Sequence, residues 1–215
     1  MKSFYLCFSF ICIVLASCTT KLNEKTEGEI DERTLLKTED LGLLVEKFND
    51  FKKCTSKNIS TNLFLINDKW MLVSAGNDSI FNTMTASWGG FGTGWNKPIA
   101  FMFIKDSRYT FEFLQKDSVY TLTFFDEKYK DTMKMLGGKS GRDSDKIKDS
   151  GLTPLIMPSG APSFKEASMI IECRKLISQP IETSSIKSEE VLNFYNEESS
   201  THNIFFGEII GVWKK

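Results

Sequence analysis

Short apolar runs separated by turn-forming residues recur from residue 62 onwards, and they predict a domain built mainly of β-strands. The run at 99–104 is continuously apolar, which is typical of a strand buried on both faces, whereas 119–125 alternates like a half-buried strand. Many short strands with few helices favour a small β-barrel with helical insertions. The strands are expected at 62–66, 70–75, 82–88, 99–104, 119–125, 168–177 and 204–212.

Apolar positions recur at helical spacing in three other segments. The segment 38–51 predicts a helix used for core or dimer packing, although Gly42 weakens its first turn. The segment 127–136 predicts an amphipathic helix that ends at Gly137 and Gly138. The polar segment 179–201 carries a small apolar patch and predicts a helical excursion.

The first residues differ from everything that follows. Lys2 precedes an apolar run at 6–15 that is too short to span a membrane as a helix, and Leu15-Ala16-Ser17-Cys18 resembles a bacterial lipobox. Such a signal implies lipidation of Cys18, which would anchor the mature chain in a membrane of the cell envelope, facing the periplasm. A plain secretory signal cut near Ser17 and retention as a single-spanning segment are the alternatives.

The chain is therefore expected to have three parts: a lipoprotein signal peptide at 1–18, a polar tether at 19–37 and a folded domain at 38–215. A length of 215 residues suits one domain with a sizeable core. The formal net charge of −1 argues against a nucleic-acid-binding protein, and 18 phenylalanines suit an aromatic-rich β core.

The cysteine and histidine content argues against a metal site. The chain has a single histidine and no pair of cysteines at ligand spacing. Cys54 and Cys173 are the thiols left after processing, and they could pair in an oxidising compartment. We expect them to stay unpaired, because Cys54 lies in a predicted linker and Cys173 in a predicted strand.

The stretch 82–88 carries the candidate chemistry. Its side chains are small and rich in hydroxyl groups, so a flat polar ligand could reach the strand's own backbone groups. Because side chains alternate along a strand, one face is expected to carry Thr83, Thr85 and Ser87, and the other Met84, Ala86 and Trp88. An ordinary Thr/Ser-rich strand is the alternative.

Residues 82–90, Asn-Thr-Met-Thr-Ala-Ser-Trp-Gly-Gly, resemble the flavin-contacting strand of the flavin reductase-like family, the FMN-binding split barrels. Residues 108–112 and 140–146 resemble the family's second and third flavin-contacting segments. Residues 95–98 resemble the loop before its next core strand, 172–176 a late strand, and His202-Asn203 with 207–209 the closing strand. The resemblance covers 69–213 in order and implies a mainly β, FMN-binding split barrel with helices.

The resemblance also implies a site. The phosphate of FMN would be held by Arg108, Arg142 and Lys146, the ribityl chain would meet Thr85, Ser87, Thr110 and Ser140, and Trp88 would form a ring wall. His202 is implied beside the flavin as the catalytic residue, where it could hydrogen-bond the substrate or supply a proton. A surface ion pair is the alternative for each arginine. The implied FMN-binding set is Asn82, Met84, Thr85, Ala86, Ser87, Trp88, Arg108, Tyr109, Thr110, Ser140, Gly141, Arg142, Lys146 and His202.

Two glycine-rich segments imitate nucleotide motifs without meeting their requirements. The run at 90–94 lacks the spacing of a dinucleotide-binding loop, and the following 95–98 cannot open a helix. Gly138-Lys139-Ser140 has Met133 where a phosphate-binding loop needs glycine, and it follows a predicted helix rather than a strand.

Three functions fit these observations. The first is an FMN-dependent reductase that takes hydride from NADH or NADPH and passes electrons to free flavin, iron or another acceptor. The second is a membrane-tethered electron carrier fed by a protein partner, which export favours because reduced nicotinamide is cytoplasmic. The third is a scaffold that merely binds a flavin. The resemblance places the reductase first, implies a homodimer with FMN at the subunit interface, and favours FMN over FAD. The segment 179–201 would then lie over the site or on the partner subunit.

Overall fold

The computed structural model describes residues 48–59, 65–197 and 200–215. All of them belong to one compact unit that begins at Glu46, and the other unit, 1–45, contains no described residue. The signal peptide, the lipidation site at Cys18, the tether and residues 38–47 of the helix predicted at 38–51 therefore lie outside the described residues. The described end of that helix was predicted wrongly, because residues 48–50 form a turn that the hydrogen bond from Phe51 N–H to the carbonyl of Phe48 closes. No helix among the described residues is long and apolar enough to cross a membrane.

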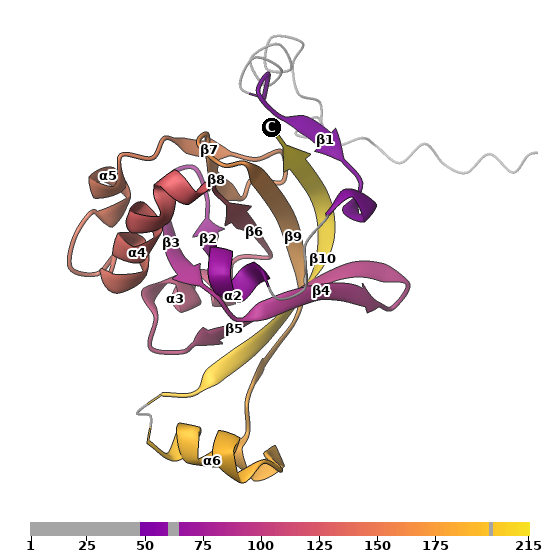
Figure 1. Ribbon diagram of the computed structural model, residues 1–215, viewed down its shortest axis with the longest axis vertical. Helices are drawn as coiled ribbons and strands as arrows, with labels where there is room; N and C mark the ends of the chain where they lie inside the picture. The colour runs from indigo at the N-terminus through magenta and orange to yellow at the C-terminus, as the bar shows by residue number, and fades with distance from the viewer. Residues whose placement is uncertain (1–47, 60–64, 198–199) are drawn as a thin grey trace, which may run out of the picture. The chain divides into compact units, whose positions relative to one another are not determined.

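One antiparallel sheet forms the body of this unit (Figure 1), with its strands in the order β3-β2-β6-β9-β10-β5-β4. The strands at the two ends of this order, β3 and β4, are consecutive in the chain and are joined by Ser87 and Trp88, so the sheet curls back on itself. The strands are β2 Met71–Gly76, β3 Phe81–Ala86, β4 Gly89–Gly94, β5 Lys97–Lys105, β6 Val119–Phe124, β9 Met169–Pro180 and β10 His202–Lys214.

Three shorter strands complete the β-structure. β1, Lys52–Cys54, pairs with β10, while β7, Pro154–Ile156, and β8, Pro162–Phe164, form a separate two-stranded sheet. The inward-facing residues of the main sheet are large and fully buried, as a packed barrel interior requires. They include Met71, Val73, Met102, Ile104, Tyr120, Leu122, Ile171 and Phe205.

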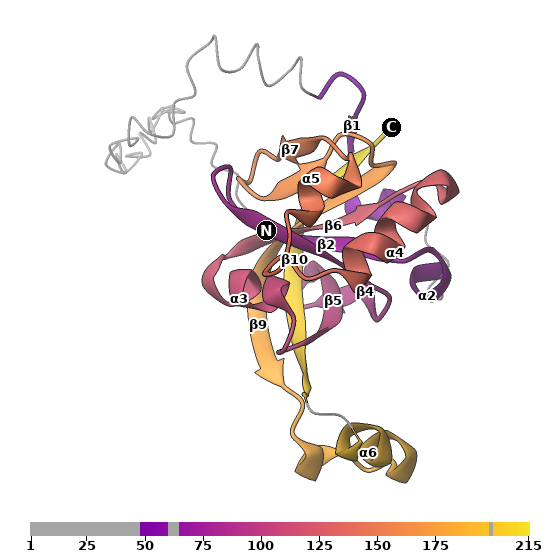
Figure 2. The same cartoon turned by 90° about the vertical axis from the view of Figure 1, so that its left-hand side faces the viewer.

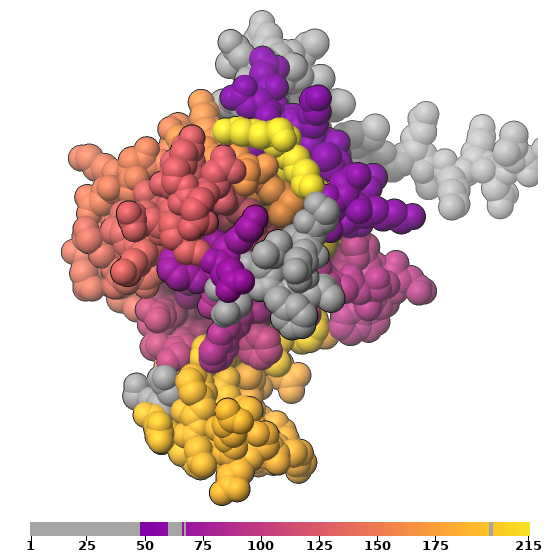
Figure 3. All heavy atoms as spheres, viewed as in Figure 1, coloured from indigo at the N-terminus to yellow at the C-terminus, as the bar shows by residue number. Residues whose placement is uncertain are grey.

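Two helices cover the β2–β3 end of the sheet. α3, Tyr109–Lys116, contacts β2 and β3, and α4, Lys130–Gly138, contacts β3 (Figure 2). α6, Glu189–Asn196, lies at the end of the long arm that β9 and β10 make together (Figure 1, Figure 3). The remaining helices are α2 Leu65–Lys69, α5 Lys146–Ser150 and the 3-10 turns η2 Ser56–Asn58, η3 Glu127–Tyr129 and η4 Thr183–Ser185.

The predicted mainly β architecture is confirmed, and six of the predicted strands are present with small shifts at their ends. The helical excursion within 179–201 is confirmed as α6. The strand predicted at 62–66 is wrong where the structure describes it, because residues 65–69 form α2. The helix predicted at 127–136 begins with η3, and α4 then runs through Gly137 and Gly138 instead of ending before them.

The burial predicted for two strands is also wrong. β6 is buried on both faces, because β8 covers its outer face: Thr121 donates a 2.5 Å hydrogen bond to the carbonyl of Pro162, and Thr123 lies 2.8 Å from the hydroxyl of Ser163. β5 is buried on one face, while Phe101 and Phe103 on the other face stay partly exposed.

The glycine-rich run 89–94 forms a strand that the sequence did not predict. β4 pairs with β5 through a tight turn in which Trp95 and Asn96 have φ angles of 50° and 57°. Two successive positive φ angles are what a two-residue hairpin turn of this hand requires. Cys54 likewise lies in a strand, β1, rather than in a linker, but it and Cys173 are unpaired, as predicted.

Candidate functional site

Strand β3 lines a groove made of two adjoining cavities. In the described part of the sheet β3 is an end strand, paired with β2 on one edge, so its other edge can offer backbone groups to a ligand. Met84 and Arg108 line both cavities, which are therefore neighbours along β3. We call the two cavities the cationic cavity and the aromatic cavity, and together the β3 groove.

The cationic cavity, of about 80 Å³, lies where the N-terminus of α3 and the C-terminus of α4 approach β3. It is lined by Asn82, Met84, Arg108, Tyr109, Thr110, Gly137, Gly138, Lys139, Ser140, Gly141 and Lys146. The aromatic cavity, of about 160 Å³, is lined by Met84, Thr85, Ala86, Ser87, Trp88, Phe103, Lys105, Arg108 and His202.

Glycine allows α4 to approach β3 closely. A Cβ atom on Gly137 would lie 2.9 Å from the Cβ of Thr85, inside the normal contact distance, whereas one on Gly138 would meet nothing within 4 Å. The hydroxyl of Thr85 donates a 2.5 Å hydrogen bond to the carbonyl of Met133 in α4. The proton of the Thr85 hydroxyl is therefore used in the hydrogen bond to α4, so this hydroxyl can only accept a hydrogen bond from a ligand.

Lys146 is a buried cation that caps the C-terminal end of α4. Its ammonium donates to the carbonyl oxygens of Leu136, at 2.9 Å, and Lys139, at 3.0 Å. Burial, and to a lesser extent the positive charge of Arg108, lowers the pKa of Lys146 from 10.5 to about 8. A bound anion would offset the repulsion between the neighbouring cations Arg108 and Lys146.

Asn82 connects the strand to α3 and to the loop after α4. Its side-chain nitrogen donates a 2.8 Å hydrogen bond to the buried hydroxyl of Thr110. A Cβ atom on Gly141 would lie 2.4 Å from the side-chain oxygen of Asn82, so only glycine permits this approach. Thr110 therefore acts on the groove through Asn82 rather than as an exposed hydroxyl.

Arg142 does not line the β3 groove. Its guanidinium forms an ion pair with Glu112, donates a 3.2 Å hydrogen bond to the carbonyl of Ser107, and lies 4.9 Å from the ring centre of Tyr109. The sequence left a surface ion pair open as the alternative for both arginines, and Arg142 forms one. Arg108 lines both cavities of the groove.

Aromatic rings surround His202 at the other end of the groove. The indole of Trp88 stacks on the imidazole with ring centroids 4.9 Å apart, and Phe194 of α6 lies 6.4 Å from the imidazole at an interplanar angle of 28°. The hydroxyl of Tyr195, also on α6, is 3.2 Å from Nδ1 of His202. His202 is thus buried and held in one orientation, while Trp88 stays 43% exposed toward the cavity.

The structure brings together every predicted site residue except Arg142 in the lining of one groove. Their roles as ligands stay predictions. Sequence reasoning missed Phe103, Lys105, Gly137, Gly138 and Lys139, although Gly-Gly-Lys directly precedes the predicted segment 140–146 and could have been included. No cluster of potential metal ligands occurs among the described residues.

The groove suits a ligand with an anionic end and a flat aromatic end. Arg108 and Lys146 can hold a phosphate, the edge of β3 can hydrogen-bond a polar chain, and Trp88 can stack on a ring. This donor set matches the three parts of FMN in kind and in order along β3.

Comparison with known proteins agrees with this geometry. Residues 65–215 match the family described as "Flavin reductase like domain". Similar solved structures are flavoredoxin of Desulfovibrio vulgaris (23% identity, 76% of each chain covered, TM-score 0.55) and the FMN-binding domain of a flavin reductases-like enzyme from Shewanella baltica (18%, 76% of each, 0.55). An FMN-binding protein from Thermus thermophilus with bound 1-cyclohex-2-enone is also similar (21% identity, 67% of this chain and 69% of that one, TM-score 0.54). No curated protein matches the chain.

Proposed function

Because this chain belongs to the flavin reductase-like family, whose split-barrel fold it shares, we propose that it binds FMN in the β3 groove and acts as an oxidoreductase. The observation that carries the proposal is that two cavities adjoin along β3, with the cations Arg108 and Lys146 in one and the aromatic pair Trp88 and His202 in the other. The phosphate would lie at the first end and the ring at the second.

When bound, FMN supplies the site that accepts and passes on electrons; the protein supplies binding, orientation and shielding. Trp88 provides a wall for the ring, and Met84 lies between the two ends of the groove. His202, positioned by Tyr195, can donate a hydrogen bond or a proton toward the groove. Arg108 and Lys146 neutralise the phosphate and fix the register of the ligand along β3.

We propose NADH or NADPH as the electron donor, and free flavin, iron or another small acceptor as the recipient. A nicotinamide donor requires one face of the flavin ring to be open, since the nicotinamide must reach the flavin. The lining of the aromatic cavity supports this donor: among the described residues it comes from β3, β5, the start of β10 and the adjoining loops, and not from α6.

The second candidate function is an electron carrier that receives electrons from a protein partner. It is favoured by α6, whose Phe194 lies 5.7 Å from Trp88 and whose Tyr195 contacts His202. A small movement of α6 toward Trp88 would cover the ring end and exclude a nucleotide. In that case the partner protein would approach α6 itself.

We propose that the chain forms a homodimer. A cluster of three aromatic side chains supports this: Phe206 on β10, Phe101 on β5 and Trp95 in the β4–β5 turn. The ring centroid of Phe206 lies 6.0 Å from that of Phe101 and 6.5 Å from that of Trp95, and Trp95 is 62% exposed. Ile177, paired with Phe206 in the sheet, is also exposed. Light scattering of the purified protein tests the proposal; a monomer at micromolar concentration would overturn it.

We also propose that a lipid on Cys18 holds the domain at a membrane of the cell envelope, facing the periplasm. The support is the lipobox-like Leu15-Ala16-Ser17-Cys18 and the polar segment 19–37 that follows. Cys18→Ala is expected to release the protein from the membrane fraction into the soluble fraction. Unchanged membrane association of this variant would contradict the anchor.

Anaerobic reduction tests the proposed function and separates it from the second candidate. Flavin-loaded protein is mixed with NADH or NADPH, and the flavin absorbance is followed. Rapid bleaching supports the reductase. Bound flavin that stays oxidised with both nucleotides but is reduced by dithionite supports the carrier. Protein that takes up no FMN would overturn both functions.

A further inference from the structure

Lysine side chains gather where β1 pairs with the end of β10, and we call this group the basic end. Among the described residues it comprises five lysines and one acidic side chain: Lys52, Lys53, Lys57, Lys214, Lys215 and Asp50. The strand register places Lys52 directly opposite Lys214. The ammonium of Lys214 also donates a 2.6 Å hydrogen bond to the carbonyl of Asn58, which follows Lys57 in η2. Two segments far apart in the chain thus bring their positive charges to one place.

The described residues do not neutralise the charges of the basic end. Like charges directly opposite each other in antiparallel strands destabilise the pair, and Lys52 and Lys214 are in this position. Lys53 and Lys215 lie over aromatic rings, which leaves their charges in place. None of the five lysines forms an ion pair with another residue that the structure describes. A partner with several negative charges would therefore relieve their repulsion.

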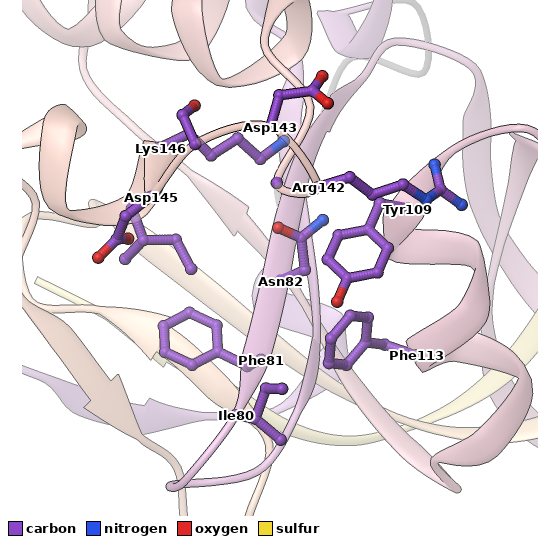
Figure 4. A pocket seen from close by; sticks show the side chains of 12 residues that line it. Ile80, Phe81, Asn82, Tyr109, Phe113, Arg142, Asp143, Asp145 and Lys146 are labelled. Atoms are coloured by element: carbon purple, nitrogen blue, oxygen red, sulfur yellow. The ribbon is translucent and has the colours of Figure 1, made fainter.

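Cations at other places in the fold lie among acidic groups. Arg142 forms an ion pair with Glu112. Figure 4 shows a cavity of about 390 Å³ beside α5, where Arg142 and Lys146 lie among Asp143 and Asp145. Opposite charges are mixed at that cavity, whereas the basic end concentrates charge of one sign. A patch of one sign attracts an oppositely charged surface over a longer range than a mixed patch does.

The opposite end of the compact unit is acidic. Residues 181–197, which include α6, carry four glutamates and one lysine, all exposed: Glu182, Glu189, Glu190, Glu197 and Lys187. Figures 1 and 2 both show β1 and the last residues of β10 at one end of the unit and α6 at the other. β10 runs between the two ends from His202 to Lys214, a path of roughly 40 Å at about 3.3 Å per residue. A negatively charged surface would therefore attract the basic end and repel α6.

The chain enters the described unit at the basic end. Phe48, the first described residue, lies just ahead of β1 and stacks on Trp213 with ring centroids 5.1 Å apart. The polar segment 19–37 and the proposed lipid on Cys18 precede it in the chain. A lipid attached through this segment would keep a membrane surface within reach of the basic end, which raises the effective concentration of headgroups there.

We propose that the basic end docks on anionic phospholipid headgroups of the membrane that holds the Cys18 lipid, and that α6 and the ring end of the β3 groove then point away from this membrane. The inference rests on the proposed lipid anchor and is independent of flavin binding. A lysine near an anionic membrane surface strengthens binding by about fivefold, so the lysines of the basic end together can orient the domain. Electron donors and acceptors would then reach the ring end from the aqueous side.

Thiol labelling of the full-length, lipid-anchored chain tests the inference. The protein is placed on vesicles of phosphatidylcholine alone or of an equal mixture with phosphatidylglycerol, and it reacts with a polyethylene glycol maleimide that cannot enter the bilayer. Asn49→Cys reports on the basic end and Val191→Cys on α6, and both positions are exposed. Cys54→Ser in both variants removes the competing thiol, since Cys173 is buried. Docking predicts that Asn49→Cys reacts at least about fivefold more slowly on the mixed vesicles, and that Val191→Cys reacts equally on both.

Two matched pairs of substitutions show whether charge causes the slowing. Lys52→Gln with Lys57→Gln, added to Asn49→Cys, should restore the fast reaction, as should high salt. Lys116→Gln with Lys134→Gln removes the same charge from exposed positions of α3 and α4 and should leave the reaction slow. If both pairs restore the rate equally, the net charge of the chain and not the basic end determines the contact, and the inference fails.

The remaining outcomes each overturn a defined claim. Equal rates for Asn49→Cys on the two kinds of vesicle would overturn the docking and leave the lipid anchor standing. Slowing of Val191→Cys in place of Asn49→Cys would show that α6 faces the membrane, which reverses the inference. Protein that does not float with either kind of vesicle would overturn the lipid anchor and the inference with it, and the proposed flavin function would stand.

Discussion

The indole of Trp88 lies against the imidazole of His202, with centroids 4.9 Å apart and planes 30° from parallel. Trp88 ends the segment that follows β3, and His202 begins β10, so the two residues join segments more than a hundred positions apart in the chain. The contact places the single histidine of the chain beside the aromatic wall of the groove.

We expect Trp88→Ala to weaken FMN binding. Stacking on an aromatic side chain is worth about 1–3 kcal/mol per ring, which corresponds to a rise in Kd of roughly fivefold to a hundredfold. Quenching of flavin fluorescence on binding measures the effect. Ile80→Ala is the control, because Ile80 lies outside both the groove and the proposed dimer surface and is 59% exposed. An equal loss in both variants would contradict the role of Trp88.

Arg108 and Arg142 should differ in their effects on FMN. A charge-assisted hydrogen bond to phosphate contributes about 1.5–3 kcal/mol, so Arg108→Gln is expected to raise the Kd of FMN by roughly tenfold to a hundredfold. Arg142→Gln should change it less than threefold, since its partners are Glu112 and Ser107 outside the groove. Riboflavin, which has no phosphate, should bind both variants like the wild type. The reverse order of the two arginines would reject the cationic cavity as the phosphate site.

FMN binding should depend on pH through Lys146. Its pKa of about 8 means that the ammonium is charged below pH 8 and neutral above it. An anion favours the charged form, so FMN affinity should be highest below pH 8 and fall as the pH rises above it. Titrations between pH 7 and pH 9.5 measure this, with riboflavin as the phosphate-free comparison. Lys146→Met should bind FMN more weakly at pH 7 and lose most of this pH dependence.

The same lowered pKa affects stability without flavin. Between pH 8 and pH 10.5 the unfolded chain keeps the proton on Lys146 while the folded chain releases it, so the free energy of unfolding should rise with pH in this window. Denaturant unfolding of the wild type and Lys146→Met at pH 7.5, 9 and 10 measures the difference between them. A difference that stays constant with pH would show that the ammonium is not destabilised in the fold.

Two adjacent glycines of α4 provide a matched pair of substitutions. Gly137→Ala places a methyl group 2.9 Å from Thr85 Cβ, so it should displace α4 from β3, lower stability by about 1–3 kcal/mol and weaken FMN binding. Gly138→Ala meets nothing within 4 Å and should be neutral or stabilising by up to about 1 kcal/mol. Thermal unfolding and FMN titration of both variants check the contrast. Similar destabilisation at both positions would indicate a general loss of helix structure instead.

His202→Gln should separate binding from reduction. The histidine lines the ring end of the groove, so the variant should still bind FMN within about threefold of the wild type. If His202 positions the substrate or supplies a proton, the rate of flavin reduction by NADH or NADPH should fall at least about tenfold. Stopped-flow absorbance measures this rate. An unchanged rate would leave His202 with a purely structural role.

Much of the barrel could be predicted from local patterns, and the failures have identifiable causes. β6 is made largely of β-branched and aromatic residues, and β2 and the start of β9 are short apolar runs; all three strands were found to within three residues at each end. Residues 65 and 66 were assigned to a strand although they begin α2, because short apolar runs carry no decisive periodicity. β4 was missed because glycines occupy four of its six positions and its turn uses Trp95 at positive φ, which is uncommon for a large side chain.

The groove was predicted through the family resemblance, but its internal contacts were not. Glu112 neutralises Arg142 from a position 30 residues away, and nothing local in the sequence indicates that pair. The hydroxyls of Thr85 and Thr110 were expected to face the ligand, yet the first holds α4 and the second receives the amide of Asn82. Such pairings depend on how helices dock on the sheet.

One titration shows whether the β3 groove holds a flavin. Protein beginning at Thr19 is titrated with FMN while flavin fluorescence and absorbance are recorded, alongside Trp88→Ala and Arg108→Gln. We expect the wild type to bind FMN stoichiometrically and to quench its fluorescence, and we expect Trp88→Ala to weaken binding at the ring end and Arg108→Gln at the phosphate end. Absence of binding, or binding that neither variant weakens, would rule out a flavin site in the β3 groove.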